Sequence, residues 1–141
     1  MNPVKSVQLW GVLVCLLLCP TLIGAARVCV KRHCFESEVA KTAEEQEMGL
    51  MFRSHLPANR AMLFVFPSSR RQAFWMKNTY LSLDLLFIGS DKRVAHIHHS
   101  AIPRTLDVIS PSVLVPYVLE INGGLSKKYR FKVGDMVTIQ E

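Results

Sequence analysis

Side chains able to bind a polar ligand gather between residues 75 and 84. An indole ring, an ammonium group, an amide and a hydroxyl come first, and an aspartate follows within an apolar run. An acid that faces a hydrophobic layer must be hydrogen-bonded or paired, because an unpaired buried charge is costly. Either the segment forms a pocket in which the indole stacks on a ligand, or backbone amides of the turn at 77–79 fix the aspartate structurally. The residues concerned are Trp75, Lys77, Asn78, Thr79 and Asp84.

A second acid, Glu120, lies in a strand-like segment that also contains Asn122. Alternation along a strand puts these two side chains on one face. If the carboxyl groups of Asp84 and Glu120 approached within about 5 to 9 Å, they would form the pair of acids that glycoside hydrolysis requires. Hydrolysis of an envelope polymer is therefore an alternative function. The other interpretation is a polar cluster near one sheet face, which adds Glu120 and Asn122 to the candidate ligand-binding or structural site.

His96 and His98 alternate along another strand-like segment, so they face the same side, while His99 faces the opposite one. Two such ligands make only half of a metal site. The pattern therefore favours an exposed, pH-sensitive strand face over a metal centre. The sequence also contains no dinucleotide fingerprint, phosphate-cradling glycine loop or Ser-His-Asp order. We expect neither a metal nor a cofactor.

The composition fits one globular domain. The chain has 141 residues, of which 50% are hydrophobic and 20% charged, and this balance excludes intrinsic disorder. Its formal net charge is +6. The basic residues occur as short pairs scattered among expected turns, which predicts a solvated surface rather than a nucleic-acid interface. No nucleic-acid partner is expected.

The first 26 residues have the layout of a secretory signal peptide. Lys5 is the only charged side chain among them, residues 9–19 are apolar, and small residues precede the end of the segment. As a helix, the apolar run spans about 16 Å against a hydrocarbon core of about 30 Å, which favours cleavage after Ala26 over an uncleaved membrane anchor. We therefore expect a periplasmic or secreted protein with one domain, residues 27–141. It touches a membrane only if the N-terminal segment is kept.

Two cysteines, Cys29 and Cys34, remain after the expected cleavage. In an oxidising compartment, a disulfide between them is one interpretation. The other is a pair of small apolar strand residues, because spacing in the sequence does not set the distance between the two Cα atoms.

The elements that must position these residues are mostly short strands. Alternating residues predict a first strand from Phe35, and the capping-box pattern that begins at Thr42 predicts a helix of about ten residues after it. Gly49 falls inside that helix, and its apolar stripe is expected in the core. Further strands are predicted at 61–66, 81–88, 94–99, 115–122 and 136–139, with a hairpin joining the second and third of these and a helical turn at 126–129. The fold class is mainly β, a single-domain sandwich or partly open barrel with one short N-terminal helix after the first strand.

Six strings occur together and in order along the chain: Gly49-Leu50-Met51-Phe52-Arg53, Met62-Leu63-Phe64-Val65-Phe66-Pro67, Phe74-Trp75-Met76-Lys77-Asn78-Thr79, Leu83-Asp84, Leu119-Glu120-Ile121-Asn122 with Gly124, and Val133-Gly134-Asp135. Over about residues 34–139 the chain resembles domain-of-unknown-function family one hundred and ninety-two, a group of small, often exported prokaryotic proteins. The resemblance implies a β-sandwich of the jelly-roll kind and brings no reaction with it. The expected export, the small size and the absence of catalytic motifs favour a non-enzymatic binding or accessory module of the cell envelope, with an envelope ligand or protein as its unidentified partner.

Overall fold

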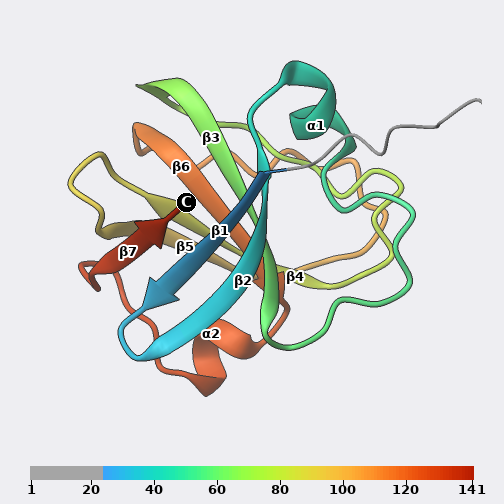
Figure 1. The fold of residues 1–141 in the computed structure, drawn as a ribbon. Helices are drawn as coiled ribbons and strands as arrows, with labels where there is room; N and C mark the ends of the chain where they lie inside the picture. Colours follow the sequence, from blue (N-terminus) through green and yellow to red (C-terminus); the bar gives the residue numbers. More distant parts are fainter. Residues whose placement is uncertain (1–23) are drawn as a thin grey trace, which may run out of the picture.

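The structure, a computed structural model, describes residues 24–141. Seven strands form one sheet in the order β5-β4-β6-β3-β2-β1-β7, and the sheet curls into a partly open barrel (Figure 1). Two short helices lie at opposite ends of the sheet. The prediction of a mainly β fold of this kind is confirmed. The elements are β1 (Gly24–Val30), β2 (His33–Ala40), α1 (Ala43–Met48), β3 (Arg60–Arg70), β4 (Leu83–Ile88), β5 (Val94–Ala101), β6 (Val115–Asn122), α2 (Leu125–Lys128) and β7 (Val137–Gln140).

The two edge strands, β5 and β7, meet at one end and narrow the opening of the barrel. A bridge pairs Arg93 with Met136, just before each strand begins. The amide of Val94 donates to the carbonyl of Asp135 over 3.0 Å, and a second bond runs from β7 back toward β5. These bonds occupy backbone groups that a free sheet edge would leave unpaired.

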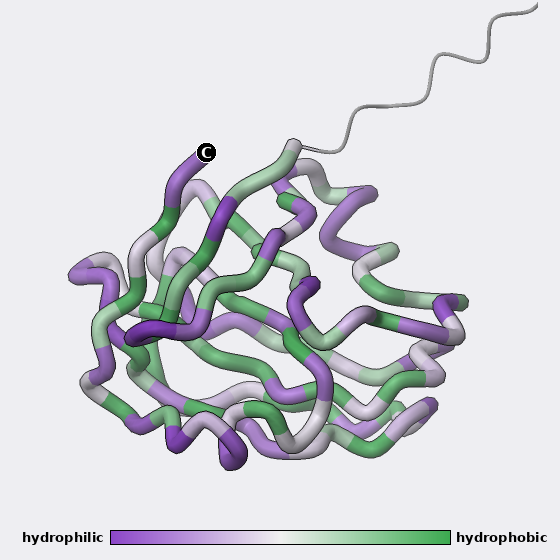
Figure 2. The backbone as a smooth tube through the Cα atoms, turned by 60° about the horizontal axis from the view of Figure 1, so that its bottom comes forward, coloured by the Kyte–Doolittle hydropathy of each residue, from purple (hydrophilic) through white to green (hydrophobic). Residues whose placement is uncertain are grey.

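Two hydrophobic layers lie on the two faces of the sheet. The first fills the barrel and takes at least one side chain from every strand. The second covers the outer face of β3, β4 and β6 beneath the connecting segments 50–56 and 74–81. Every residue of β4 is therefore buried, and the prediction of a strand covered on both faces holds for Ala61–Phe64. Along the tube in Figure 2, green stretches follow the strands that cross the middle, and purple gathers at the turns.

The helix α1 begins where the sequence predicts. The hydroxyl of Thr42 accepts a hydrogen bond from the amide of Glu45 over 3.2 Å, and the carboxylate of Glu45 accepts one from the amide of Thr42 over 2.9 Å. This is the expected capping box. The helix is shorter than predicted, because Gly49 ends it with a φ of 47° instead of lying inside it. Glycine adopts such a backbone without the penalty that a side chain would bring.

Replacing Thr42 with alanine is expected to lower the free energy of unfolding by about 1 kcal/mol, because the amide of Glu45 loses its acceptor. Chemical denaturation of the variant and of the parent protein measures the difference. Thr42→Ser, which keeps the hydroxyl, is the matched control and should stay close to the parent. Equal losses in both variants would contradict the capping role.

The apolar stripe predicted for the core lies at the surface instead. Met48 and Phe52 are 53% and 59% exposed. The prediction assumed a continuous helix, but the chain turns after Gly49, and Phe52 adopts a left-handed backbone with a φ of 63°. The residues of the stripe therefore share no helical face, and they border the candidate site described below.

The strand β1 is not among the predicted elements, and α1 consequently follows the second strand rather than the first. β1 pairs with β2 on one side and with β7 on the other. The predicted cleavage point after Ala26 falls within β1, and residues 1–23 of the predicted signal peptide lie outside the described residues. Between Gly24 and the C-terminus, no helix has the length and apolar character needed to cross a membrane.

Cys29 and Cys34 face each other across the β1–β2 hairpin and form a disulfide. Their sulfur atoms are 2.07 Å apart, and their Cα atoms 4.0 Å apart. The strand register itself pairs the two residues. Of the two interpretations that the sequence leaves open, the structure thus shows the bonded one.

Candidate functional site

The candidate site is built around Glu120, near the middle of the sheet. In β6 this residue stands opposite Met62 of β3 and Leu85 of β4. Its side chain points to the outer face of the sheet and is only 5% exposed. Because side chains alternate along a strand, Glu120 lies on the same face as Val118 and Asn122, next to the outer hydrophobic layer.

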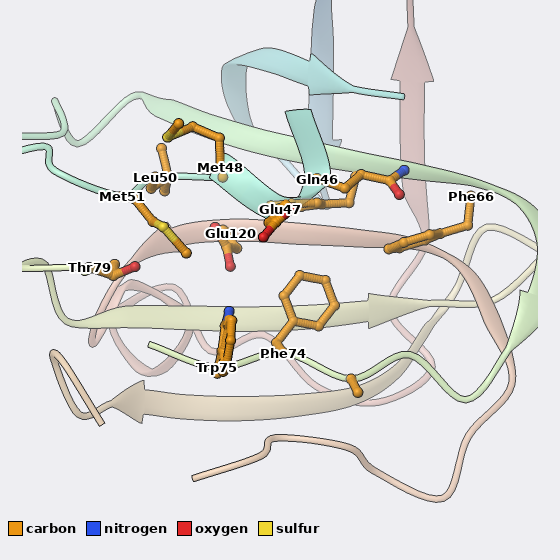
Figure 3. Close-up of a pocket in the computed structure, with 13 residues that line it drawn as sticks. Gln46, Glu47, Met48, Leu50, Met51, Phe66, Phe74, Trp75, Thr79 and Glu120 are labelled. Carbon is orange, nitrogen blue, oxygen red and sulfur yellow. The ribbon is translucent and has the colours of Figure 1, made fainter. Parts of the chain in front are cut away.

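A pocket of about 240 Å³ opens above the carboxyl group of Glu120. The last turn of α1 and the segment after it form one wall, and the segment 73–75 forms the facing wall. In Figure 3 the carboxyl of Glu120 points into the space between these walls, toward the rings of Phe74 and Trp75. The full lining is Gln46, Glu47, Met48, Gly49, Leu50, Met51, Phe64, Phe66, Ala73, Phe74, Trp75, Thr79 and Glu120.

Glu120 has no hydrogen-bond or ion-pair partner among residues 24–141. Burial raises its pKa to about 8, since nothing charged compensates for the water that the carboxylate would lose. At neutral pH the side chain is therefore mainly a neutral carboxylic acid. A group of this kind donates one hydrogen bond when protonated and accepts several when ionised.

Exposed apolar side chains occur in the pocket lining, at Met48 and Trp75, and at Phe52 and Tyr80, which follow the lining residues Met51 and Thr79 in the chain. Met48, Phe52, Trp75 and Tyr80 are each at least 42% exposed, and the rings of Phe52 and Tyr80 meet edge to face at 6.4 Å. The amide of Phe52 donates to the carbonyl of Asn78 over 2.8 Å, and both residues have a positive φ. A left-handed backbone is unfavourable for a bulky residue such as phenylalanine. This bond therefore stabilises an unfavourable backbone conformation directly after Met51, which lines the pocket.

Asp84 lies on the other face of the sheet, inside the barrel, and is fully buried. Its carboxylate accepts hydrogen bonds from the amides of Ser100, Gly124 and Ser126 at 2.7 to 3.0 Å and from the hydroxyl of Ser126 at 2.5 Å. Burial alone would raise the pKa of Asp84, but these hydrogen bonds outweigh it and hold the pKa below its ordinary value.

The interpretation that backbone amides of the turn at 77–79 hold Asp84 is therefore wrong. The donors come instead from the end of β5 and from the loop that begins α2. Donors so distant along the chain cannot be read from local spacing, because they reach Asp84 only when β5 and β6 pair with β4.

The two acids do not form a pair. Asp84 stands opposite Ile121 in the register of β4 and β6, whereas Glu120 stands opposite Leu85. Directly paired residues share a face, and the next residue along the strand points to the other face. Asp84 and Glu120 are thus separated by the sheet itself, and the hydrolase hypothesis loses the acid pair on which it depended.

The other predicted site residues fall into two groups. Trp75 and Thr79 line the Glu120 pocket, while Lys77 and Asn78 line a cavity that adjoins it at Trp75, with the ammonium group of Lys77 5.0 Å from the centre of the indole ring. Asn122 lies elsewhere, where its amide donates to the carbonyl of Leu56 over 2.7 Å and holds the loop before β3.

The histidines of β5 are also divided. His96 and His98 border a separate hollow beside the segment 102–111. Burial, and then the neighbouring His96 and His99, lower the pKa of His98. His99 lies on the opposite side, 2.8 Å from the hydroxyl of Ser126. Within the described part of the chain, no three side chains gather in a way that would hold a metal ion.

Glu47, Met48, Met51 and Phe74 line the pocket but are not among the predicted site residues. Met48 and Met51 belong to the stripe that the sequence assigns to the core, because an apolar stripe at helical spacing usually packs inside a protein. The early end of α1 is what brings the stripe to the pocket mouth. In the structure, the positive φ of Gly49 marks that end. The sequence shows a glycine at this position but does not reveal which backbone conformation it adopts.

The fold and the site together define a small, partly open β-barrel with a pocket of about 240 Å³ on its outer face. A family model for an uncharacterised group, domain-of-unknown-function family one hundred and ninety-two, matches residues 26–139, and the chain belongs to that family. The suspected resemblance is thereby confirmed.

Two solved structures are similar over most of this chain. A protein of unknown function from Novosphingobium aromaticivorans DSM 12444 is 39% identical, with a TM-score of 0.76 over 81% of this chain and 83% of the other. A candidate transcription regulator from Sinorhizobium meliloti 1021 is 37% identical, with a TM-score of 0.76 over 81% of this chain and 91% of the other. No curated protein matches the chain.

Proposed function

We propose that the protein is an exported binding module of the cell envelope that holds a small ligand in the Glu120 pocket. One observation carries the proposal: a buried carboxyl group without a partner among the described residues faces a cavity lined by aromatic and methionine side chains. A buried polar group without a partner costs free energy. A ligand that supplies the missing partner would recover that cost, which is a reason to keep the acid there.

Two features support export. The first 26 residues have the layout of a signal peptide, and Cys29 and Cys34 form a disulfide. Disulfides persist mainly in oxidising compartments such as the periplasm and the cell exterior. Periplasmic or secreted placement follows as part of the proposal, with the N-terminal segment as a membrane anchor if it is not removed.

Methyl resonances of the methionines test the binding function. Met48 and Met51 line the pocket, whereas Met136 is similarly exposed to Met48 but lies outside it, at the start of β7. With methyl-labelled methionine, a screen of neutral and charged small molecules at millimolar concentration should shift the first two signals and leave Met136 unchanged. A hit that binds the pocket should also lose roughly two- to tenfold in affinity in Trp75→Ala, because ring stacking on an aromatic side chain is worth about 0.5 to 1.5 kcal/mol.

Met136→Ala is the control variant and should bind the same hits with unchanged affinity. A screen in which no compound moves Met48 or Met51, or in which Met136 always moves with them, would count against a binding pocket at this place.

A further inference from the structure

The wall of the Glu120 pocket has a charge opposite to that of the whole protein. The chain carries 17 basic and 11 acidic side chains, yet among residues 24–141 the lining includes two acids, Glu47 and Glu120, and no lysine, arginine or histidine. Figure 3 shows the carboxyl groups of both acids directed into the same space from α1 and β6. The last turn of α1, which forms part of this wall, has no basic residue either.

Aromatic and sulfur-containing side chains complete the wall. The ring of Phe74 and the indole of Trp75 stand across from the two acids (Figure 3), and Met48 and Met51 border the opening. Aromatic faces attract cations through their quadrupole, and they do so most strongly where water is excluded. The wall thus has carboxyl groups on one side and two aromatic rings on the other, with the indole nitrogen of Trp75 directed toward Glu120 (Figure 3).

We infer that the pocket binds a small organic cation, an ammonium group on an apolar body, with Glu120 as its counter-ion and Phe74 and Trp75 packed against it. This inference rests on the proposed binding function and names the class of its ligand. A cation is favoured over a neutral ligand because it would supply what the buried acid lacks. A neutral ligand can accept a hydrogen bond from the protonated acid, but only a charged partner makes the carboxylate form of Glu120 stable.

A cation–π contact, the kind of interaction on which the inference depends, is present on the surface beside the pocket. The ammonium group of Lys77 lies 5.0 Å from the centre of the Trp75 ring, on the side of the adjoining cavity. The indole of Trp75 is therefore placed where a cation can reach its face. Because Lys77 lines that adjoining cavity and not the Glu120 pocket, it does not neutralise Glu120 itself.

Benzylammonium and benzyl alcohol form a matched pair of probes, with nearly the same shape and different charge. At pH 8 the protein should bind benzylammonium roughly tenfold or more tightly than benzyl alcohol, as measured by titration of the methyl signals of Met48 and Met51. Binding of the cation at pH 7 should also release a proton, because Glu120 must ionise. Calorimetry in buffers of different ionisation enthalpy measures that release. Glu47 is the other titratable side chain in the lining, and Lys77 is the charged group beyond Trp75.

Glu120→Gln keeps the shape and removes the charge, so it should bind both probes with similar affinity and release no proton. Glu36→Gln, on the exposed side of β2, is the charge-matched control and should retain the preference of the parent. If the parent binds benzyl alcohol as tightly as benzylammonium, the cation inference is overturned while the binding pocket stands. If neither probe shifts Met48 or Met51, even at millimolar concentration, and the wider screen gives no hit, the proposed function fails as well.

Discussion

Asp84→Asn is expected to lower the free energy of unfolding by about 3 to 5 kcal/mol, the range observed when one partner of a buried charged network is lost. The carboxylate accepts four hydrogen bonds and makes none as a donor. In asparagine, an NH₂ group replaces one carboxylate oxygen. Because this group donates hydrogen bonds, it would face the backbone amide donors and could not accept hydrogen bonds from them. At least one amide of the loop that begins α2 would then be buried without an acceptor.

Urea denaturation of the variant against the parent protein measures this loss. Asp107→Asn makes the same chemical change at an exposed position and should stay within about 0.5 kcal/mol of the parent. If Asp84→Asn does not fold, Ser126→Ala gives a milder test, because it removes only the hydroxyl donor and should cost about 1 to 2 kcal/mol. An Asp84→Asn protein as stable as the Asp107→Asn control would contradict a structural role for the carboxylate.

The pH dependence of the stability that Asp84 contributes follows from the direction of its pKa shift. Its pKa in the folded protein lies below the ordinary value, so the folded state holds the ionised form more strongly than the unfolded state does. The stability it contributes is present above the ordinary pKa and is lost as the pH falls through the lowered one. The difference between the parent and Asp84→Asn should therefore shrink in acid.

The sequence predicts the positions of the strands better than it predicts which strands pair with one another. Alternation and apolar runs locate β2 to β7 within a few residues, because the side chains of each strand report directly on the faces that they bury. β1 is missed, since Gly24 to Ala26 resemble the small residues before a signal cleavage site as closely as they resemble a strand. Their pairing with β2 and β7 depends on segments far away in the sequence.

Prediction of the candidate site has the same limit: the sequence shows the residue types but not how the strands pair. The sequence identifies Glu120, Trp75 and Thr79 as candidates from their types, and the structure brings these three to one pocket. The sequence also groups Asp84 with these three residues, because Asp84 and Glu120 are both acids in apolar strands. Which face each acid occupies depends on the register between β4 and β6, and a shift of one residue would exchange the faces.

The two buried acids are opposite cases of one physical problem. Asp84 is ionised and fully bonded, so it holds β4, β5 and the α2 loop together. Glu120 is also buried, but it faces a pocket and has no protein partner among the described residues, and without a ligand it can lower its cost only by keeping its proton. A residue that costs stability where an apolar side chain would fit is a candidate for function rather than for folding.

Glu120→Gln is accordingly expected to stabilise the protein. Burial raises the pKa of Glu120 from 4.5 to about 8, so below pH 4.5 both the folded and the unfolded states keep the proton and the variant should match the parent. Between these values the unfolded state ionises while the folded state does not. The free energy of unfolding of the parent then falls by about 1.4 kcal/mol for each pH unit.

The glutamine has no proton to lose. The free energy of unfolding of the variant should therefore exceed that of the parent by about 3 kcal/mol at pH 7 and by about 5 kcal/mol above pH 8. Urea denaturation at several pH values measures the difference, and the exposed Glu36→Gln should show none of this dependence. A gap that is the same at pH 4.5 and pH 8 would mean that Glu120 is not the titrating group. A gap that closes when benzylammonium is added at pH 8 would connect the stability cost of Glu120 to the ligand, because the cation stabilises the parent's carboxylate and has nothing to neutralise in the variant.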